Sequence, residues 1–414
     1  MNNYDVVIIG GGPAGLAASL EVYKNNKSCL IIEREASLGG ILKQCIHDGF
    51  GVIRFNDKLS GPEYTERFID QVINKHIPYL TLSFVTKIEK EKDLYILHVV
   101  TREGIKIITA NKIIFATGCR ERTSKQIFIH GTRPAGIFTA GTAQALVNLN
   151  GLMPTKKAVI LGSGDIGLIM ARRLTLEGAK VVGVYEVKNE PSGLARNIHQ
   201  CLYDYNIPLY LSTTVTRVIG DDRLTAVEIA KVDNKMNVIE NSKQIVECDS
   251  LILSVGLIPE NELALTLGVK LNKFSKGPEC DQSLETNINN VYTCGNATHV
   301  NNLVDYVSES AEIAAKNSCI EKRERKLISI NVNENVLYVV PTLIDVNNSK
   351  KDVVMYFRSN KSIGKATVKI NVDGKSIFVK TYLNIKPPEM EKIVVDFKDV
   401  NENAKIDFEI IKEN

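Results

Sequence analysis

Short runs of apolar residues that end in glycine-rich turns dominate the first two thirds of the chain. Residues 6–9 are all β-branched and apolar, which is typical of a buried parallel strand. The turn at 10–15 follows with glycines in the spacing G-x-G-x-x-G, and residues 16–23 then predict a helix. A second apolar run, 29–32, ends on Glu33. The chain is therefore predicted to begin with a strand–helix–strand unit.

The same order of elements occurs a second time. Residues 158–161 predict a strand, 162–167 repeat the G-x-G-x-x-G turn, and 168–176 predict a helix. The next apolar run, 181–185, ends on Glu186. Self-similarity of this kind indicates a duplicated structural unit, so we expect two similar halves.

Each predicted half also contains further short strands and a last strand that ends on glycine. The runs in the first half are 79–89, 94–101, 105–110 and 112–115. The last of them leads into Ala116–Gly118. In the second half, a three-run meander over 209–246 precedes a strand at 250–254, which Gly256 closes. The repeat therefore extends well beyond the glycine turns.

Two longer helices are predicted outside the repeated unit. Residues 60–63 (Ser-Gly-Pro-Glu) are typical of a helix start, because they combine a capping serine with proline in the first turn. This helix is expected to end near Asn74. Later in the chain, an apolar strand within 290–296 precedes a predicted helix at 304–316.

Beyond residue 326 the pattern changes to short alternating runs that predict β-strands. These runs are 336–340, 353–357, 366–370, 377–383, 393–397 and 406–411. Residues 372–375 (Val-Asp-Gly-Lys) predict a two-residue hairpin. Residues 327–414 are expected to form a small β-sandwich or barrel without chemistry of its own, since they contain no His or Cys. The charged run 321–326 before it predicts a solvated helix end or linker.

Together these patterns predict an α/β protein. It should contain tandem Rossmann-like dinucleotide-binding domains, each with three ββα layers, and a small C-terminal all-β domain. The predicted domains are residues 1–120 with 280–325, residues 121–279, and residues 327–414.

The two glycine turns predict two dinucleotide sites. Glycine permits a tight turn and a close approach of the backbone to a pyrophosphate, which lies at the positive end of the following helix. Glu33 and Glu186 are placed to accept hydrogen bonds from a ribose hydroxyl. Two such sites in one chain indicate a pair of cofactors that work together.

Composition excludes several classes of function. Of 414 residues 44% are hydrophobic, which is enough for the cores of two or three domains. The net charge is only +3 with both signs interspersed, which argues against nucleic-acid partners. The chain enters a strand at once and has no apolar stretch of bilayer length, so we expect neither a signal peptide nor an integral membrane protein. The eight cysteines show no CxxC or zinc-like spacing, which favours free thiols in the cytoplasm and no metal.

The motifs resemble a known family. The two glycine turns, Ala116–Gly118 and residues 294–296 are similar to the flavoproteins with two dinucleotide domains that include thioredoxin reductase. The resemblance implies FAD in the first site and NAD(P)H in the second. Residues 39–51, 131–144 and 294–300 resemble more closely the FAD-dependent oxidoreductases associated with bacterial glycerol-3-phosphate utilisation. These are themselves similar to NADH-linked flavoprotein subunits of amino-acid and opine dehydrogenases.

This resemblance implies an oxidoreductase subunit that exchanges hydride between NAD(H) and FAD. Its partners would be a glycerol-3-phosphate dehydrogenase-like flavoprotein and a small cysteine-containing protein in an oligomer or hetero-complex. The expected FAD residues are Gly10, Gly12, Pro13, Ala14, Gly15, Glu33, Arg34, Gly40, Ala116, Thr117, Gly118, Gly295 and Asn296. The expected NAD residues are Gly162, Gly164, Asp165, Ile166, Gly167, Glu186 and Gly256.

Two details of these sites depart from the family or leave a choice open. Asn296 stands where most of the family has aspartate, which removes a charge near the flavin but keeps hydrogen-bonding capacity. Glu186 favours the free 2′-hydroxyl of NAD over the phosphate of NADP. Lys188, Arg172 and Arg173 lie close in sequence and weaken this preference, so NADP remains the less favoured alternative.

The catalytic residues stay unknown, and Cys45 is a weak candidate. It would act as a redox thiol near the flavin, but the alternative is a buried cysteine without chemistry. His47 and Asp48 line the same segment or satisfy local backbone groups. Three rival functions remain: a self-contained NADH oxidase or peroxidase, a reductase of a small acceptor, and a flavin-bearing scaffold with a vestigial NAD site.

Overall fold

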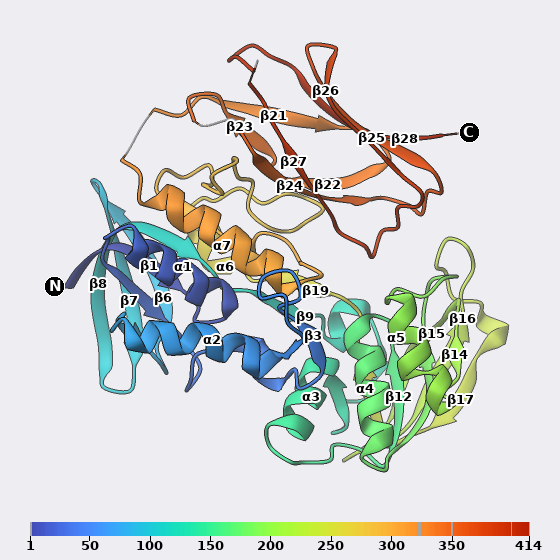
Figure 1. Ribbon diagram of the computed structural model, residues 1–414. Coiled ribbons are helices and arrows are strands. Elements are labelled where there is room, and N and C mark those ends of the chain that lie inside the picture. The colour runs from blue at the N-terminus through green and yellow to red at the C-terminus, as the bar shows by residue number, and fades with distance from the viewer. Residues whose placement is uncertain (1, 322–323, 349–350, 399, 414) are drawn as a thin grey trace. The chain divides into compact units, whose positions relative to one another are not determined.

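The chain folds into two compact units, shown in a computed structural model (Figure 1). The structure describes residues 2–321, 324–348, 351–398 and 400–413. Unit 1 comprises Met1–Cys119 and Pro259–Asn414, and unit 2 comprises Arg120–Ile258. The chain leaves unit 1 in β9 (Cys119–Glu121) and returns in β19 (Leu257–Pro259).

The nucleotide-binding part of unit 1 is built on one mixed sheet in the order β5-β2-β1-β8-β7-β6, with β20 also paired to β8. Its strands are β1 (Asn2–Ile9), β2 (Cys29–Ile32), β5 (Tyr79–Leu80), β6 (Phe84–Glu91), β7 (Leu94–Thr101), β8 (Gly104–Phe115) and β20 (Val291–Thr293). Its helices are α1 (Pro13–Lys24), α2 (Gly61–Asn74), α6 (Glu262–Thr266) and α7 (Val304–Ser318). A short pair, β3 (Asp48–Phe50) and β4 (Leu59–Ser60), precedes α2.

The alternation of side chains along β1 produces the layers of unit 1. Val6 and Ile8 are fully buried in the core that contains α1, α2 and α7. Val7 and Ile9 point to the opposite face, where they pack with β6 and β7. Because both faces of the strand are covered, the run is apolar throughout, as expected for a central parallel strand. This confirms the predicted three-layer ββα arrangement.

Unit 2 repeats this design on separate sheets. Its parallel sheet has the order β11-β18-β12-β13-β14, and its second sheet has the order β10-β15-β16-β17. The parallel strands are β11 (Ile137–Thr139), β12 (Lys157–Leu161), β13 (Lys180–Tyr185), β14 (Leu209–Tyr210) and β18 (Ser250–Leu253). The others are β10 (His130–Gly131), β15 (Thr213–Gly220), β16 (Leu224–Lys231) and β17 (Gln244–Glu247), with helices α3 (Ala140–Asn148), α4 (Asp165–Leu176) and α5 (Ala195–Cys201).

Burial again alternates along the central strand of unit 2. Ala158 and Ile160 pack with α3 and α4, whereas Val159 and Leu161 pack with β15 and β16. The two Rossmann-like sheets that the sequence predicted are therefore both present, each with helices on one face and a meander on the other.

The C-terminal part of unit 1 is a β-sandwich. One sheet has the order β23-β21-β28-β25-β26 and the other the order β22-β24-β27. Its strands are β21 (Leu327–Val332), β22 (Val336–Val340), β23 (Leu343–Asp345), β24 (Val353–Ser359), β25 (Ala366–Val372), β26 (Lys375–Tyr382), β27 (Glu391–Val395) and β28 (Ile406–Lys412). Phe357 and Phe408, from opposite sheets, are fully buried in one shared core. The predicted hairpin is confirmed, with Asp373 and Gly374 at φ 49° and 79° between β25 and β26.

The predicted capping signal at the start of α2 is confirmed, whereas α1 and α4 each begin three residues before the predicted starts at 16 and 168. The side chain of Ser60 accepts a hydrogen bond from Glu63 N at the start of α2, and Ser60 N in turn donates to the Glu63 carboxylate at 2.7 Å. Among the described residues, no helix is both long enough and apolar enough to cross a membrane.

Two strand predictions were wrong in detail. The run 79–89 is interrupted, because Leu82 adopts φ 47° and breaks the extended backbone between β5 and β6. The runs 105–110 and 112–115 form the single strand β8. Its first half pairs with β7 and its last residues pair with β20, so one strand serves both the meander and the parallel sheet.

Residues 259–279, expected in the second domain, pack in unit 1 in the structure. Ala264 and Val269 from this segment are buried in the core formed around Val7 and Ile9. Their apolar side chains complete the layer on the meander face of the first sheet, a contact that no local pattern encodes.

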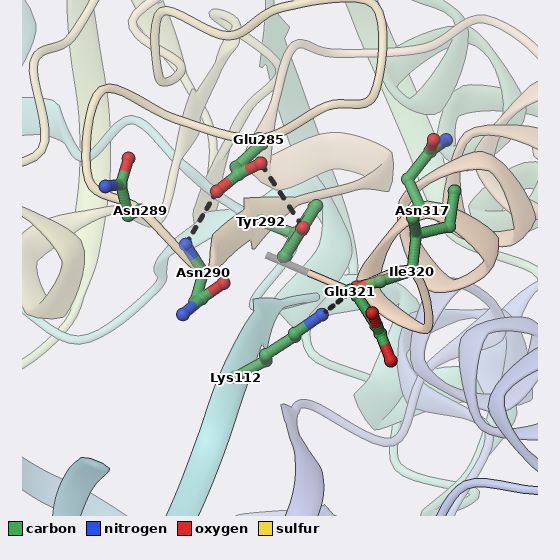
Figure 2. Close-up of a pocket in the computed structure, with 8 residues that line it drawn as sticks. All are labelled: Lys112, Glu285, Asn289, Asn290, Tyr292, Asn317, Ile320 and Glu321. Atoms are coloured by element: carbon green, nitrogen blue, oxygen red, sulfur yellow. Dashed lines mark hydrogen bonds between the residues drawn. The ribbon is translucent and has the colours of Figure 1, made fainter. Parts of the chain in front are cut away.

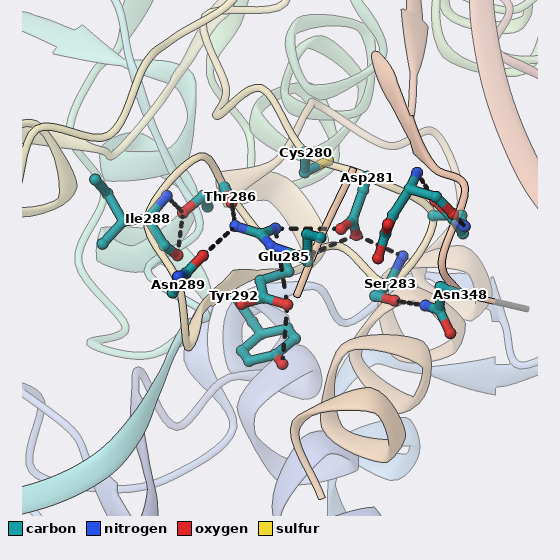
Figure 3. A network of polar contacts seen from close by, with 12 residues as sticks. Cys280, Asp281, Ser283, Glu285, Thr286, Ile288, Asn289, Tyr292 and Asn348 are labelled. Carbon is teal, nitrogen blue, oxygen red and sulfur yellow. Dashed lines mark hydrogen bonds and ion pairs between the residues drawn. The ribbon is translucent and has the colours of Figure 1, made fainter. Parts of the chain in front are cut away.

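The charged run 321–326 is not uniformly solvated. Lys322 and Arg323 lie outside the described residues, but the side chain of Arg325 is only 6% exposed. Its guanidinium pairs with Asp281 at 3.2 Å and donates to Thr286 O at 2.8 Å, within the network shown in Figure 3. Burial raises the pKa of Asp281 to about 6. The prediction was wrong for Arg325 because its partners come from residues 281–289, which lie elsewhere in the sequence.

Candidate functional site

The first glycine turn connects β1 to α1 in a backbone arrangement that only glycine fits. Gly10 has φ 111° and donates its N–H to Ile32 O at 2.9 Å. A Cβ atom on Gly10 would lie 2.3 Å from Ala116 O, and one on Gly15 would lie 1.8 Å from Gly10 O. The turn is therefore as tight as the neighbouring backbone allows. We call residues 10–15 and the segments that converge on them the first cradle.

Glu33, at the end of β2, stabilises the glycine turn of the first cradle through hydrogen bonds. Its side chain is buried, and its carboxylate accepts hydrogen bonds from Gly11 N at 2.6 Å and from Glu35 N at 2.8 Å. A carboxylate has about four lone-pair positions, so two remain for the hydroxyls of a ribose. Glu33 thus both orders the turn and keeps capacity for a ligand.

The N-terminus of α1 presents backbone donors to the first cradle. Among the described residues, no side chain caps this end of the helix, and its first turn contains no acidic residue. The N-cap is Gly12, where an added Cβ would lie 3.7 Å from Gly40 Cα. Free N–H groups at a positive helix end without a side chain in the way fit a pyrophosphate.

Segments far apart in sequence converge on this helix end. Gly295 donates its N–H to Ser310 Oγ at 2.9 Å, and a Cβ atom on Gly295 would lie 2.9 Å from the Cβ of Ala14. Asn296 follows directly, and its Oδ1 accepts from Asn301 N at 2.9 Å. The structure therefore brings the expected FAD residues at the start and near the end of the nucleotide-binding region together.

The Ala116–Gly118 turn and Arg34 share a partner that sequence reasoning missed. Glu260 accepts from Thr117 Oγ1 through its backbone oxygen at 2.6 Å, and its N–H donates to Gly118 O at 2.9 Å. Its carboxylate pairs with Arg34 at 3.2 Å. Arg34 is half-exposed and held by a protein carboxylate. No signal in the sequence marked Glu260, because it lies in the irregular region after Pro259.

Cys45 does not have the surroundings of a redox thiol. Its Sγ contacts Ile41 O at 3.5 Å, and burial raises the pKa of the thiol to about 12. At neutral pH the sulfur is therefore protonated, and a thiol is a poor nucleophile compared with a thiolate. The ring of His47 nearby packs against that of Phe50, with centroids 4.9 Å apart and the planes tilted by 37°, and contacts Asp48 O. Both observations favour the reading in which this segment has a packing role.

The second glycine turn, in unit 2, repeats the first. Gly162 has φ 96° and donates to Tyr185 O at 2.7 Å. Glu186 is buried and accepts from Ser163 N at 3.0 Å and Lys188 N at 3.1 Å, the same two kinds of contact that Glu33 makes. We call residues 162–167 and the segments that converge on them the second cradle.

Side chains line the second cradle more closely. Ser163 Oγ donates to Glu186 at 2.6 Å, and Ser254 Oγ accepts from Gly167 N at 3.0 Å. Asp165, in the first turn of α4, accepts from Leu194 N at 2.9 Å and from Asn197 Nδ2 at 2.7 Å. Gly164 is the N-cap of α4, and Ile166 follows Asp165 in the same first turn. Gly256, at φ 100°, ends the strand segment beside them.

A small polar pocket in unit 1 is separate from the first cradle. Figure 2 shows Lys112, Glu285 and Tyr292 around it. Lys112 donates to Ile320 O at 2.5 Å, and Glu285 accepts from Tyr292 Oη at 3.3 Å. None of its described lining residues is an expected cofactor residue. Within the described part of the chain, no cluster of three His, Cys, Asp or Glu residues could hold a metal ion.

Two acid-anchored glycine cradles, each on its own Rossmann-like sheet, define a protein that binds two nucleotides. A family model described as pyridine nucleotide-disulphide oxidoreductase matches residues 4–318, so the chain belongs to this family. Members of this thioredoxin-reductase-like family bind FAD and NAD(P)H, and these are the cofactors of the chain. The predicted thioredoxin-reductase-like family, the fold class and the cofactors are thereby confirmed; the closer resemblance to the oxidoreductases of glycerol-3-phosphate utilisation stays a prediction.

Individual relatives agree with this assignment. The hydrogen cyanide synthase subunit HcnB of Pseudomonas protegens is 25% identical over 66% of this chain, and the match spans 60% of HcnB. An opine oxidase subunit of Rhizobium meliloti is 23% identical over 72% of this chain and 67% of its own length. The crystal structure of T. acidophilum thioredoxin reductase has the same fold, with a TM-score of 0.62 at 20% identity over 77% of this chain and 98% of that chain.

Proposed function

We propose that the protein is an oxidoreductase that exchanges hydride between NAD(H) in the second cradle and FAD in the first. The observation that carries this proposal is the repeated anchoring contact, Glu33 to Gly11 N and Glu186 to Ser163 N. Two nucleotide cradles with the same internal geometry in one chain serve a pair of nucleotides better than a single substrate. When both are bound, the nicotinamide and the flavin supply the hydride chemistry, and the protein supplies position and electrostatics.

The assignment of nucleotides to cradles follows from how each helix end is lined. The first cradle offers free backbone donors, which favours a tightly bound FAD. In the second, Ser254 already accepts the N–H of Gly167, so part of the gain from binding a pyrophosphate is offset. This favours a nucleotide that exchanges during turnover. The residues expected for each nucleotide from the sequence are proposed as its ligands, with one exception. Arg34 pairs with Glu260 and is proposed to position Glu260, which contacts the Ala116–Gly118 turn, rather than to bind the nucleotide itself.

Contacts in unit 2 support NAD rather than NADP. Glu186, which accepts from Ser163 N, is proposed to face the ribose 2′-hydroxyl, where a carboxylate would repel a phosphate. The two arginines that could have countered it have protein partners: Arg172 donates to Tyr205 Oη at 3.2 Å, and Arg173 pairs with Glu177 at 2.8 Å.

The chain is further proposed to act as one component of a multi-component dehydrogenase. HcnB and the opine oxidase relative are both subunits by name. The finer proposal is a partner that oxidises glycerol 3-phosphate and a small cysteine-containing protein, supported by the motifs at 39–51, 131–144 and 294–300. A self-contained peroxidase that uses Cys45 is disfavoured, because burial raises the pKa of this thiol.

The test is anaerobic reduction of the purified holoprotein by NADH, followed through the visible absorbance of the flavin. We expect full bleaching by NADH and much weaker bleaching at equal NADPH. If NADH leaves the flavin oxidised while dithionite bleaches it, hydride exchange is not the function.

A matched pair of variants assigns the cradles. Alanine fits at both N-cap positions, since the nearest atoms to an added Cβ lie at 3.7 Å for Gly12 and 3.4 Å for Gly164. Gly12→Ala should weaken FAD binding about tenfold, and Gly164→Ala should raise the NADH concentration for half-maximal bleaching about tenfold, as the methyl group meets the pyrophosphate. The reverse pattern would exchange the nucleotides between the cradles.

A further inference from the structure

A short segment leads from the first cradle to the N-terminus of α7 and is tied back onto the cradle. Asn296 Oδ1 accepts from Asn301 N at 2.9 Å and from Asn301 Nδ2 at 3.3 Å. Asn301 Nδ2 also donates to His299 O at 3.0 Å. The Asn296 side chain is thus held at its oxygen by residue 301 and at its nitrogen by Cys119, to whose Sγ Nδ2 donates at 3.6 Å.

The near half of this segment is fixed by the nucleotide-binding part of unit 1. Asn261 Nδ2 donates to Ala297 O at 2.8 Å, and a Cβ atom on Gly277 would lie 1.6 Å from Thr298 O. Residue 297 is thus held by the side chain of Asn261, and residue 298 lies in close backbone contact with residue 277. In the far half, His299, Val300 and Asn302 have partners in the C-terminal sandwich, whereas Asn301 is bound to Asn296.

Arg358, on β24 of the sandwich, forms hydrogen bonds with residues 300 and 302 of this segment. Its Nη2 donates to Val300 O at 3.1 Å and also to the side-chain oxygen of Asn302. Its Nε donates to Tyr338 Oη at 2.8 Å, while Nη1 donates to Pro387 O at 3.1 Å and to Pro388 O at 2.5 Å. A planar guanidinium with all its directions used holds its acceptors in one geometry, which lysine cannot do.

Two further contacts join residues 299–303 to the sandwich. Asn302 Nδ2 donates to Pro388 O at 2.8 Å, on the loop that Arg358 also binds. The ring of His299 is 1% exposed and packs against Tyr338 and Tyr356, with centroids at 5.9 and 5.2 Å. Burial and the charge of Arg358 lower the pKa of His299 to about 3, so the ring stays neutral between the two tyrosines.

We propose that the C-terminal sandwich is a clamp for the FAD site and that Arg358 is its positioning residue. By holding residues 299–303, Arg358 keeps Asn296 and the N-terminus of α7 in the arrangement that receives FAD. Ordering a free segment costs backbone entropy, so a segment ordered beforehand binds its ligand more tightly. This inference rests on the proposed placement of FAD in the first cradle.

The experiment measures FAD binding to the apoprotein by quenching of flavin fluorescence, together with thermal unfolding of each apoprotein. For Arg358→Gln we expect about a tenfold rise in the FAD dissociation constant, and for Asn302→Ala about a threefold rise. Lys369→Gln is the matched control, because Lys369 lies on β25 in the other sheet of the sandwich; it should leave FAD binding unchanged.

Thermal unfolding separates a positioning role from a purely structural one. If the clamp positions the segment, Asn302→Ala weakens FAD binding while its apoprotein unfolds at the wild-type temperature. If the role is purely structural, the FAD affinity falls only together with the unfolding temperature, which contradicts the proposal. If folded Arg358→Gln or Asn302→Ala protein binds FAD with wild-type affinity, the proposal is wrong. If Arg358→Gln does not fold, the result for Asn302→Ala decides. NADH bleaching of the wild-type flavin tests the proposed function separately and does not depend on this outcome.

Discussion

The two cradles share one plan and differ in what lines it. In each, a buried glutamate at the end of the second strand accepts the N–H of the second residue of the turn, from Gly11 or Ser163. Glu33 accepts two hydrogen bonds from the protein, whereas Glu186 accepts three, since Ser163 Oγ adds another. The second cradle also contains Asp165 and Ser254 at the helix end, where the first has only backbone.

This difference teaches how one motif serves two kinds of ligand. Backbone N–H groups without acceptors raise the free energy of the empty site and gain hydrogen bonds when a nucleotide binds. The first cradle therefore suits a nucleotide that stays tightly bound. Donors that already have protein partners reduce both effects, and the second cradle suits a nucleotide that leaves after each turnover. The sequence G-x-G-x-x-G is the same in both, and the residues between the glycines make the distinction.

The largest expected effect comes from filling the third glycine of each turn. Gly15→Ala places a Cβ 1.8 Å from Gly10 O, whereas Gly167→Ala places one 2.9 Å from the corresponding oxygen, Gly162 O, and 2.6 Å from Ser254 Cβ, so the backbone clash is milder. We expect Gly15→Ala to lose FAD and about 3 kcal/mol of unfolding free energy, and Gly167→Ala to lose about 1 kcal/mol. Urea unfolding and flavin content of the purified variants measure both. Equal losses would mean that the two turns are equally tight.

The next effect is a pH dependence of unit 1 through His299. Its pKa is about 3 in the folded protein and near the ordinary 6.5 when unfolded. Below pH 6.5 the unfolded chain therefore binds a proton that the folded protein excludes, and stability falls as pH falls, by about 2 kcal/mol at pH 5. Urea unfolding across this range should show the loss in the wild type.

The control for this prediction is His299→Phe, which keeps a ring between Tyr338 and Tyr356. It should remove the extra acid sensitivity, and FAD should be retained at pH 5 better than in the wild type. If both proteins lose stability in parallel as the pH falls, His299 is not the group responsible.

The smallest expected effect comes from making the second cradle more like the first. Ser254→Ala frees the N–H of Gly167 for a pyrophosphate. We expect about threefold tighter NADH binding with FAD affinity unchanged. The reason is that the released N–H of Gly167 gains a hydrogen-bond partner only when the nucleotide binds. Titration of flavin bleaching with NADH measures this. Weaker binding would show instead that the Ser254 hydroxyl itself contacts the nucleotide.

Local sequence determined much of this protein. The β-branched runs, the glycine turns and the capping box at Ser60 and Glu63 depend on backbone sterics and on contacts within a few residues, which a pattern can express. The acids at 33 and 186 were also found from spacing alone, because a strand of fixed rise ends at a fixed distance from the turn.

Tertiary structure alone decided the contacts that complete the first cradle. Gly295 meets Ala14, Glu260 holds Arg34 and the Gly118 turn, and Arg358 grips residues 299–303. The same is true of Arg325, a charged residue in a polar run that is buried only because Asp281 lies opposite it. Such partners are joined by packing between segments far apart in the chain, and the energy of a buried charge or a shared backbone contact depends on the neighbour rather than on the residue itself.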